Sequence, residues 1–152
     1  MMNKRNMLGL AAVGLLLWSF NFATGPRDLI AKKWKFDIEY LKEVFNKEIE
    51  KRKQGDPENV PSEAEIEQGR QMVEMAMGSI VMDFKADGVY SVSAMGQSEE
   101  GTWQLSDDGK TLELVTGGKT EKFKIVKLTE NEMIWESQAE GEGTELKLIP
   151  AE

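Results

Sequence analysis

Regular alternation of apolar and polar residues over the second half of the chain constrains the fold more than any other feature. From Ile80 to Ile149, short alternating runs are interrupted at intervals of about ten residues by turn-forming residues. Asp107-Asp108-Gly109 is the strongest of these turn signals, because glycine adopts positive φ without a Cβ clash. The pattern predicts an antiparallel meander that curls into a sandwich or closes into a barrel.

The alternation also predicts which residues face the interior. Trp34, Phe36, Ile38 and Tyr40 alternate with charged residues and predict a first strand over residues 33–40. The later runs place further residues on the same inner face: Ile80, Met82, Phe84, Tyr90, Val92, Ala94, Gly101, Trp103, Leu105, Leu112, Leu114, Phe123, Ile125, Met133, Trp135, Leu146 and Leu148. Together they predict a mainly β protein, an antiparallel up-and-down barrel of about eight strands.

A helical period separates the first strand from the others. Leu41, Val44, Phe45 and Ile49 are spaced by three and four residues, and Gly55 is the expected C-cap. Ser62-Glu63-Ala64-Glu65 has the pattern of a capping box at the start of a second helix, which should end near Gly78. We therefore predict a two-helix insertion, about residues 41–78, with both helices packed on the barrel.

The N-terminus has the pattern of a targeting segment. Lys4 and Arg5 precede an apolar run from Met7 to Phe20, which is shorter than the roughly 20 residues of a spanning helix. We predict that residues 1–24 are a signal peptide or, alternatively, an uncleaved N-terminal anchor, and that residues 25–152 form one domain. The protein is then exported to the periplasm or cell envelope, with membrane contact only through an uncleaved segment.

Composition argues against several functional classes. The chain contains no cysteine and no histidine, so thiolate nucleophiles, zinc-thiolate sites and histidine bases are excluded. A formal net charge of −8 disfavours nucleic acid as a partner. No phosphate-binding loop or catalytic motif is present. We therefore expect a protein that is not an enzyme, has no catalytic residues and needs no cofactor.

Three motifs carry a resemblance to a known family. They are Phe84-x-x-Asp87-Gly88-x-Tyr90, Gly101-x-Trp103-x-Leu105 and Leu128-Thr129-x-Asn131-x-Met133. With Trp34 on the first strand, they resemble the bacterial lipocalin-like domains over roughly residues 30–149. The Gly-x-Trp of true lipocalins is replaced here by Lys32-Lys33-Trp34. The resemblance implies a small calycin-type barrel whose calyx holds a hydrophobic small molecule.

Aromatic residues and one methionine are the candidate ligand-binding residues: Trp34, Met75, Phe84, Tyr90, Trp103, Phe123 and Trp135. The alternative is that the aromatic residues only fill the barrel. The protein would then be a structural or protein-interaction module of the cell envelope, with the helical hairpin docked on another envelope protein. Cavity volume discriminates between the two, because a pocket of roughly 300 Å³ or more favours a ligand-binding protein.

Two groups of residues have the donor atoms of a metal site. Met72, Met75 and Met77 offer thioethers, the soft ligands that Cu(I) prefers. Methionine is also the usual pliable apolar residue, and we expect these three to form a flexible lid near the barrel mouth. The acidic stretch from Glu136 to Glu145 lacks the spacing of a calcium loop. We therefore predict no metal site.

Overall fold

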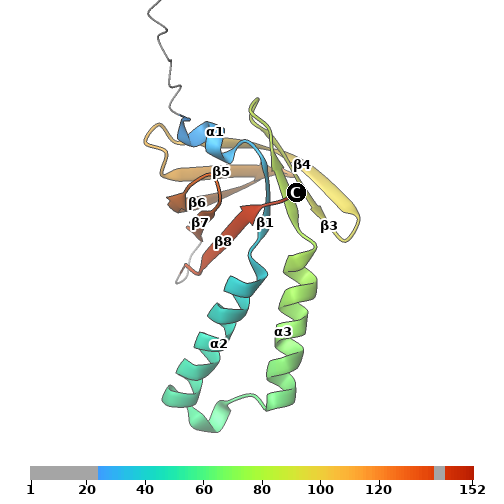
Figure 1. Cartoon of the computed structure of the whole chain (residues 1–152), viewed down its shortest axis with the longest axis vertical. Helices are drawn as coiled ribbons and strands as arrows, with labels where there is room; N and C mark the ends of the chain where they lie inside the picture. Colours follow the sequence, from blue (N-terminus) through green and yellow to red (C-terminus); the bar gives the residue numbers. More distant parts are fainter. Residues whose placement is uncertain (1–23, 139–142) are drawn as a thin grey trace, which may run out of the picture.

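The computed structural model describes residues 24–138 and 143–152, which form a closed eight-stranded barrel with two long helices inserted after the first strand (Figure 1). The strands are β1 (Lys33–Phe36), β2 (Val81–Phe84), β3 (Val89–Ala94), β4 (Gln97–Leu105), β5 (Thr111–Thr116), β6 (Lys119–Leu128), β7 (Met133–Ser137) and β8 (Glu145–Pro150). The helices are α1 (Pro26–Ile30), α2 (Ile38–Gly55), the short 3-10 helix η1 (Pro57–Asn59) and α3 (Glu63–Gly78). Each strand pairs antiparallel with the next, and β8 pairs with β1. The predicted mainly β, up-and-down barrel with a helical insertion is therefore confirmed.

Two hairpins of the barrel have tight two-residue turns. Met95 and Gly96 join β3 to β4, and Gly117 and Gly118 join β5 to β6. All four have positive φ, as type I′ turns require. Gln97 and Ser98, which follow the first of these turns, already belong to β4.

The interior of the barrel is built mainly from residues that alternation assigned to it, with the addition of Ile30 from α1. The largest fully buried side chains are Trp34, Phe84, Ile30, Leu112, Met133 and Leu148. Trp103 and Trp135 are 3% and 2% exposed, so their predicted burial is confirmed. These residues form one hydrophobic cluster, which the helical insertion joins through a few side chains.

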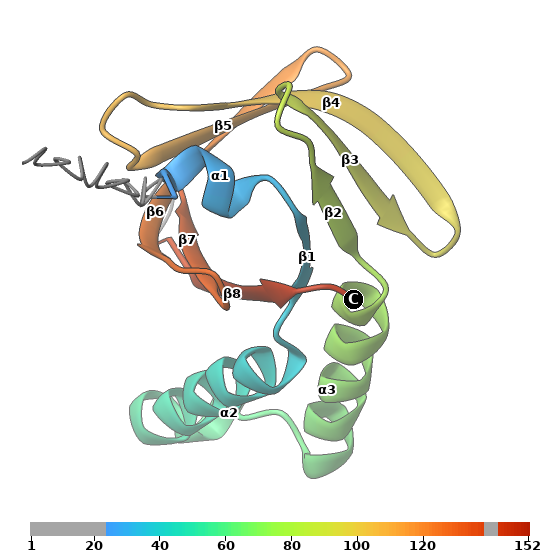
Figure 2. The same ribbon diagram turned by 45° about the horizontal axis from the view of Figure 1, so that its top comes forward.

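Helix α1 lies over one end of the barrel (Figure 2). Its last residue, Ile30, is fully buried, and the Ile30 carbonyl accepts a 2.9 Å hydrogen bond from Trp34 Nε1. The Arg27 guanidinium stacks 4.6 Å from the centroid of the Trp103 ring and donates to the Ala86 carbonyl at 3.3 Å. We call this the closed end of the barrel. No helix was predicted from the sequence over residues 26–30.

The first strand is shorter than predicted, because α2 begins at Ile38. Asp37 is the N-cap, and its side chain accepts a hydrogen bond from the Tyr40 N–H at 3.2 Å. The predicted strand over residues 33–40 is therefore wrong beyond Phe36. Ile38, Leu41 and Phe45 share a helical spacing that continues the period of the insertion.

Asp37 also ties the start of α2 to β8. Its N–H donates to the Lys147 carbonyl at 2.9 Å, and its carboxylate lies 3.1 Å from Lys147 Nζ. Burial raises the pKa of the Asp37 carboxyl, but the hydrogen bond from Tyr40 and the Lys147 ammonium outweigh it, so the pKa lies below its ordinary value. The same contact with Asp37 raises the pKa of Lys147. A backbone hydrogen bond and an ion pair therefore both hold the start of α2 against β8.

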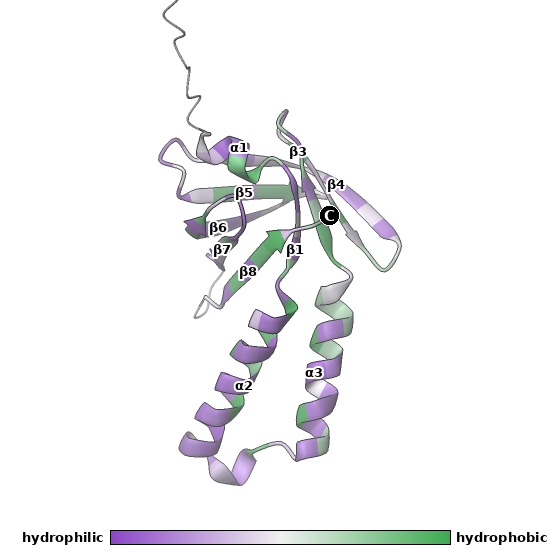
Figure 3. Ribbon diagram, viewed as in Figure 1, coloured by the Kyte–Doolittle hydropathy of each residue, from purple (hydrophilic) through white to green (hydrophobic). Residues whose placement is uncertain are grey.

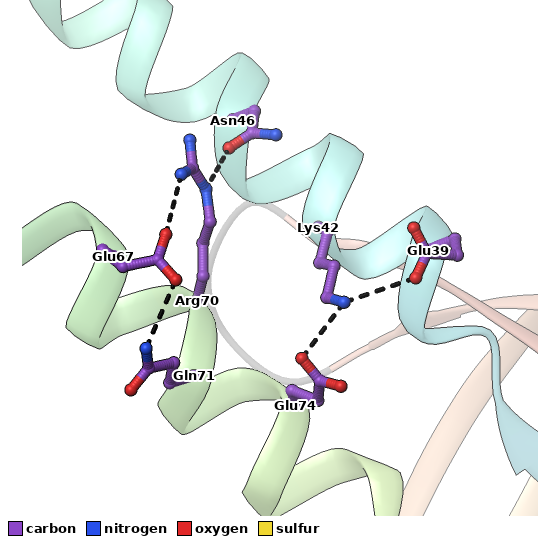
Figure 4. A network of polar contacts seen from close by, with 7 residues as sticks. All are labelled: Glu39, Lys42, Asn46, Glu67, Arg70, Gln71 and Glu74. Carbon is purple, nitrogen blue, oxygen red and sulfur yellow. Dashed lines mark hydrogen bonds and ion pairs between the residues drawn. The ribbon is translucent and has the colours of Figure 1, made fainter.

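Polar contacts join α2 to α3 along the hairpin (Figure 4). Lys42 Nζ lies 3.1 Å from a Glu74 carboxylate oxygen, and Arg70 Nε donates to Asn46 Oδ1 at 2.9 Å. At the start of α3, the predicted capping box of Ser62 and Glu65 is confirmed. The predicted C-cap of the first helix is wrong: Gly55 is the last helical residue, and Asp56 is the cap.

Only the roots of the two helices pack on the barrel. Ile38 and Leu41 from α2, with Val73 and Met77 from α3, join the barrel core. The rest of the hairpin projects away from the strands (Figure 1), and α2 is largely hydrophilic (Figure 3). The prediction that both helices pack on the barrel therefore holds for their first or last turns.

The predicted signal peptide or anchor falls, up to residue 23, outside the described residues. Across the described parts of the chain, no helix is both long enough and apolar enough to cross a bilayer.

Candidate ligand-binding site at the open end of the barrel

The end of the barrel opposite α1 holds an apolar pocket of about 250 Å³. We call this the apolar pocket, and the end where it lies the open end. Seven strands and the residue before β2 contribute to its lining: Phe36, Ile80, Met82, Tyr90, Val92, Leu114, Glu121, Phe123, Trp135 and Leu146. All of these except Glu121 are aliphatic or aromatic. They share the inward parity of their strands, which is why residues distant in sequence meet here.

Aromatic rings form much of the wall between the packed interior and the pocket. The Phe123 and Trp135 rings stack with centroids 4.5 Å apart and an interplanar angle of 21°. Deeper in the barrel, Phe84 stacks on Tyr90 at 5.6 Å and meets Trp103 edge-on at 5.8 Å. Such contacts favour one fixed arrangement of the rings, so the pocket wall is preorganised.

A second pocket of about 270 Å³ adjoins the first and is more polar. We call it the rim pocket. It shares four lining residues with the apolar pocket (Tyr90, Val92, Leu114 and Glu121) and adds Glu99, Thr116 and Lys119. These additions come from the ends of β4, β5 and β6 at the open end of the barrel. The inner face of the barrel therefore changes from apolar to charged towards the open end.

Gly101 on β4 allows the two walls of this site to approach. A Cβ at this position would lie 2.7 Å from Tyr90 Cε1 and 2.8 Å from Thr116 Oγ1, and would also overlap the Val115 carbonyl. The hydroxyls of Tyr90 and Thr116 are hydrogen-bonded to each other across the gap. The absence of a side chain at Gly101 thus lets Tyr90 cross β4 and reach β5.

The indole N–H groups of the three buried tryptophans have different surroundings. Trp34 Nε1 and Trp103 Nε1 donate to the carbonyls of Ile30 and Lys85, at 2.9 and 2.8 Å. Trp135 Nε1 is buried and has no hydrogen-bond partner among the described residues. It is the unsatisfied polar atom of the pocket wall.

The structure brings together three of the seven residues predicted to bind a ligand. Tyr90, Phe123 and Trp135 line the apolar pocket. Trp34, Phe84 and Trp103 lie in the packed part of the core and do not line it. Met75 is 70% exposed on α3.

The predicted methionine lid is wrong for Met72 and Met75, which are 62% and 70% exposed and line neither pocket. Because α3 meets the barrel only with its C-terminal end, Met77 reaches the core cluster and the earlier methionines do not.

Several lining residues were assigned to the interior by alternation but not to the site. Phe36, Val92, Leu114 and Leu146 belong to this group. Glu99, Lys119 and Glu121 have the same inward parity, since Glu99 is opposite Val92 and Glu121 is opposite Leu114. The turn positions determine the register of strand pairing, and the register places these charged residues beside the pocket-lining residues. Strand register was therefore the available signal for these residues.

Within residues 24–138 and 143–152, no group of three or more acidic side chains could hold a metal ion. Asp108 shows that an acidic residue in a turn can stabilise the turn through hydrogen bonds. The Ser106 hydroxyl and the Lys110 N–H donate to its carboxylate at 2.6 and 3.0 Å, and the Ser106 bond lowers the pKa of Asp108. The acidic stretch from Glu136 to Glu145 lies partly outside the described residues.

Comparisons with known proteins agree with this architecture. No curated protein matches the sequence significantly. Among solved structures, a DUF4847 family protein from Bacteroides vulgatus is similar in fold, with a TM-score of 0.53 and 14% sequence identity over 80% of this chain and 93% of that one. A family model described as a lipocalin-like domain matches residues 47–135, which extend from α2 to β7. The chain therefore belongs to the lipocalin-like domain family.

Proposed function

We propose that this protein binds a small apolar ligand in the open end of its barrel and that it is not an enzyme. The observation that carries the proposal is the apolar pocket, in which nine of ten lining residues are aliphatic or aromatic. The rest of the interior is packed around Trp34, Phe84 and Trp103, and α1 closes the far end. A ligand in the apolar pocket would therefore enter from the end of the barrel opposite α1, as in a calyx.

The driving force is removal of apolar surface from water, worth about 25 cal/mol per Å² before the costs of association. The volume of 250 Å³ sets the size of the ligand. A water molecule occupies about 30 Å³ of liquid and a methylene group is of similar size, so the pocket holds about eight such groups. This volume is slightly below the roughly 300 Å³ typical of ligand pockets, and the adjoining rim pocket extends it.

Calorimetric titration of the full-length protein with octanol tests the proposal. Val92→Trp and Leu146→Trp each place an indole in the apolar pocket and should weaken octanol binding by at least about tenfold. Val126→Trp is the matched control, since Val126 lies on β6 and is 44% exposed. Circular dichroism shows whether each variant is folded. Octanol binding that is unchanged in folded pocket-filling variants would contradict the assignment of the site.

Absence of octanol binding to the wild-type protein would instead favour the structural or protein-interaction module as the function. In that case the apolar pocket would be a packing defect of the barrel, and the hairpin would be the element to test for an envelope partner.

We also propose that the protein is exported through its N-terminal segment. The support is the basic Lys4 and Arg5, followed by the apolar run from Met7 to Phe20. Cell fractionation of a C-terminally tagged protein should place it outside the cytoplasm. A Leu15→Asp variant, which interrupts the apolar run, should retain it inside. Recovery of the wild-type protein at full length in the soluble cytoplasmic fraction would contradict export.

A further inference from the structure

Charged residues of the rim pocket give information on the ligand beyond its apolar part. Glu99, Glu121 and Lys119 line this pocket at the exposed edge of the barrel. None of the three has an ion-pair partner among the described residues. The outward-facing glutamates of neighbouring strands differ: Glu113 lies 3.1 Å from Lys122, and Glu136 lies 3.5 Å from Lys124. The three charged residues of the rim pocket therefore do not neutralise one another through an ion pair and stay available to a ligand.

We infer that the ligand is a cationic amphiphile, with a primary ammonium between Glu99 and Glu121 and a short apolar chain in the apolar pocket. The inference rests on the proposed function, because it uses the same pocket for the apolar chain. Two carboxylates and one ammonium leave the rim pocket with a net negative charge, which selects a cation. The formal net charge of −8 on the whole chain acts in the same direction at long range.

The position of Glu121 makes the two parts of such a ligand compatible. Glu121 lines both pockets, so an ammonium bound to it is at the entrance of the apolar pocket. Lys119 lies two residues earlier on β6, on the same inner face. Its ammonium repels a cationic head and keeps the head near the carboxylates.

Three octyl compounds with different head groups separate charge from chain length. Octylammonium, octanol and octanoate are each titrated into the full-length protein by calorimetry at low ionic strength. We expect octylammonium to bind about five- to tenfold more tightly than octanol, and octanoate to bind most weakly. The preference should decrease as salt is added, because the head-group contacts are near the surface.

Glu99→Gln and Glu121→Gln should each reduce the ratio of octylammonium affinity to octanol affinity by about two- to fivefold. Glu100→Gln is the matched control, because Glu100 is adjacent on β4 with opposite parity and removes the same charge. Lys119→Gln should increase octylammonium affinity.

Equal binding of octanol and octylammonium would overturn the inference and leave the proposed function intact. Preference for octanoate would also overturn it and would make Lys119 the anchor of an anionic head. An effect of Glu100→Gln as large as that of Glu121→Gln would show that only total charge matters. Failure of all three compounds to bind would refute the proposed function itself.

Discussion

Replacement of each buried tryptophan by phenylalanine isolates the contribution of one indole N–H to stability. Trp34, Trp103 and Trp135 are 0%, 3% and 2% exposed, so the same change removes a similar buried volume at each site. The positions differ in hydrogen bonding. Trp34 and Trp103 donate to backbone carbonyls, whereas Trp135 has no partner among the described residues.

The difference in free energy of unfolding follows from these contacts. Trp34→Phe and Trp103→Phe each lose a hydrogen bond worth about 0.5–1.5 kcal/mol. Trp135→Phe removes a buried donor whose unsatisfied state costs about 1–3 kcal/mol in the wild-type protein. Phenylalanine at position 34 or 103 also weakens the cation–π contact with Lys32 or Arg27, which further lowers the free energy of unfolding of these two variants. We expect Trp135→Phe to be less destabilising than either of the others by at least about 1.5 kcal/mol.

Urea denaturation followed by far-ultraviolet circular dichroism measures this difference without relying on tryptophan emission. The dependence of the free energy of unfolding on urea concentration should be the same for all variants. Equal slopes show that the variants expose the same surface area on unfolding. Equal losses at the three positions would refute the reasoning, because they would show that cavity formation alone determines stability. A loss at Trp135 larger than at Trp103 would show that the Trp135 N–H has a partner in solution.

Two further changes test the root of the helical insertion and the wall of the site. Asp37→Ala should lower the free energy of unfolding by about 1–2 kcal/mol at neutral pH, through loss of the α2 cap and of the contact with Lys147. Because folding lowers the pKa of Asp37, its charge stabilises the protein above the unfolded-state pKa and ceases to do so as pH falls through the folded-state pKa. The gap between wild type and variant should therefore narrow from about pH 7 to about pH 3 in urea denaturation, and an unchanged gap would contradict the role of the charge. Gly101→Ala should cost about 2–3 kcal/mol, because its Cβ would overlap Tyr90, Thr116 and the Val115 backbone. Gly55→Ala, with open space at its Cβ, is the control and should be neutral or stabilising in the same thermal or urea assay.

The barrel was predictable from sequence because strand parity is a local property. Asp107-Asp108-Gly109 and Gly117-Gly118 mark turns, and alternation between turns determines which residues face inward. The position at which the first strand ends was harder to predict from the sequence. Ile38 and Tyr40 fit a period of two with Trp34 and Phe36, and Ile38 also fits a helical period with Leu41. Asp37, a favoured N-cap residue directly before Ile38, was the available signal for the helix.

The site was only partly predictable from the sequence, because a pocket forms where the inward-facing side chains of the barrel do not fill the interior. Alternation assigned Trp103 and Trp135 to the same interior, but it does not say which of them borders empty space. Helix α1 has five residues and no hydrophobic period of its own, so its closure of one end was not visible. Met72 and Met75 were misplaced because the direction in which the hairpin leaves the barrel is a tertiary property.

Unequal strand lengths account for the rim pocket at the open end. Strands β1 and β2 contain four residues each and span about 13 Å, whereas β4 and β6 contain nine and ten and span about 30 Å. The barrel can close around its full circumference only over the height of the short strands. That height is occupied by Trp34, Phe84 and the residues packed on them. Beyond it, the longer strands present inner faces that no opposite strand covers. Glu99 and Lys119 lie near the open ends of β4 and β6 and line the rim pocket there, whereas the apolar pocket also has Phe36 of β1 and Met82 of β2 in its wall. The helical insertion lies between the end of β1 and the start of β2, so it joins the barrel at the same end as both pockets.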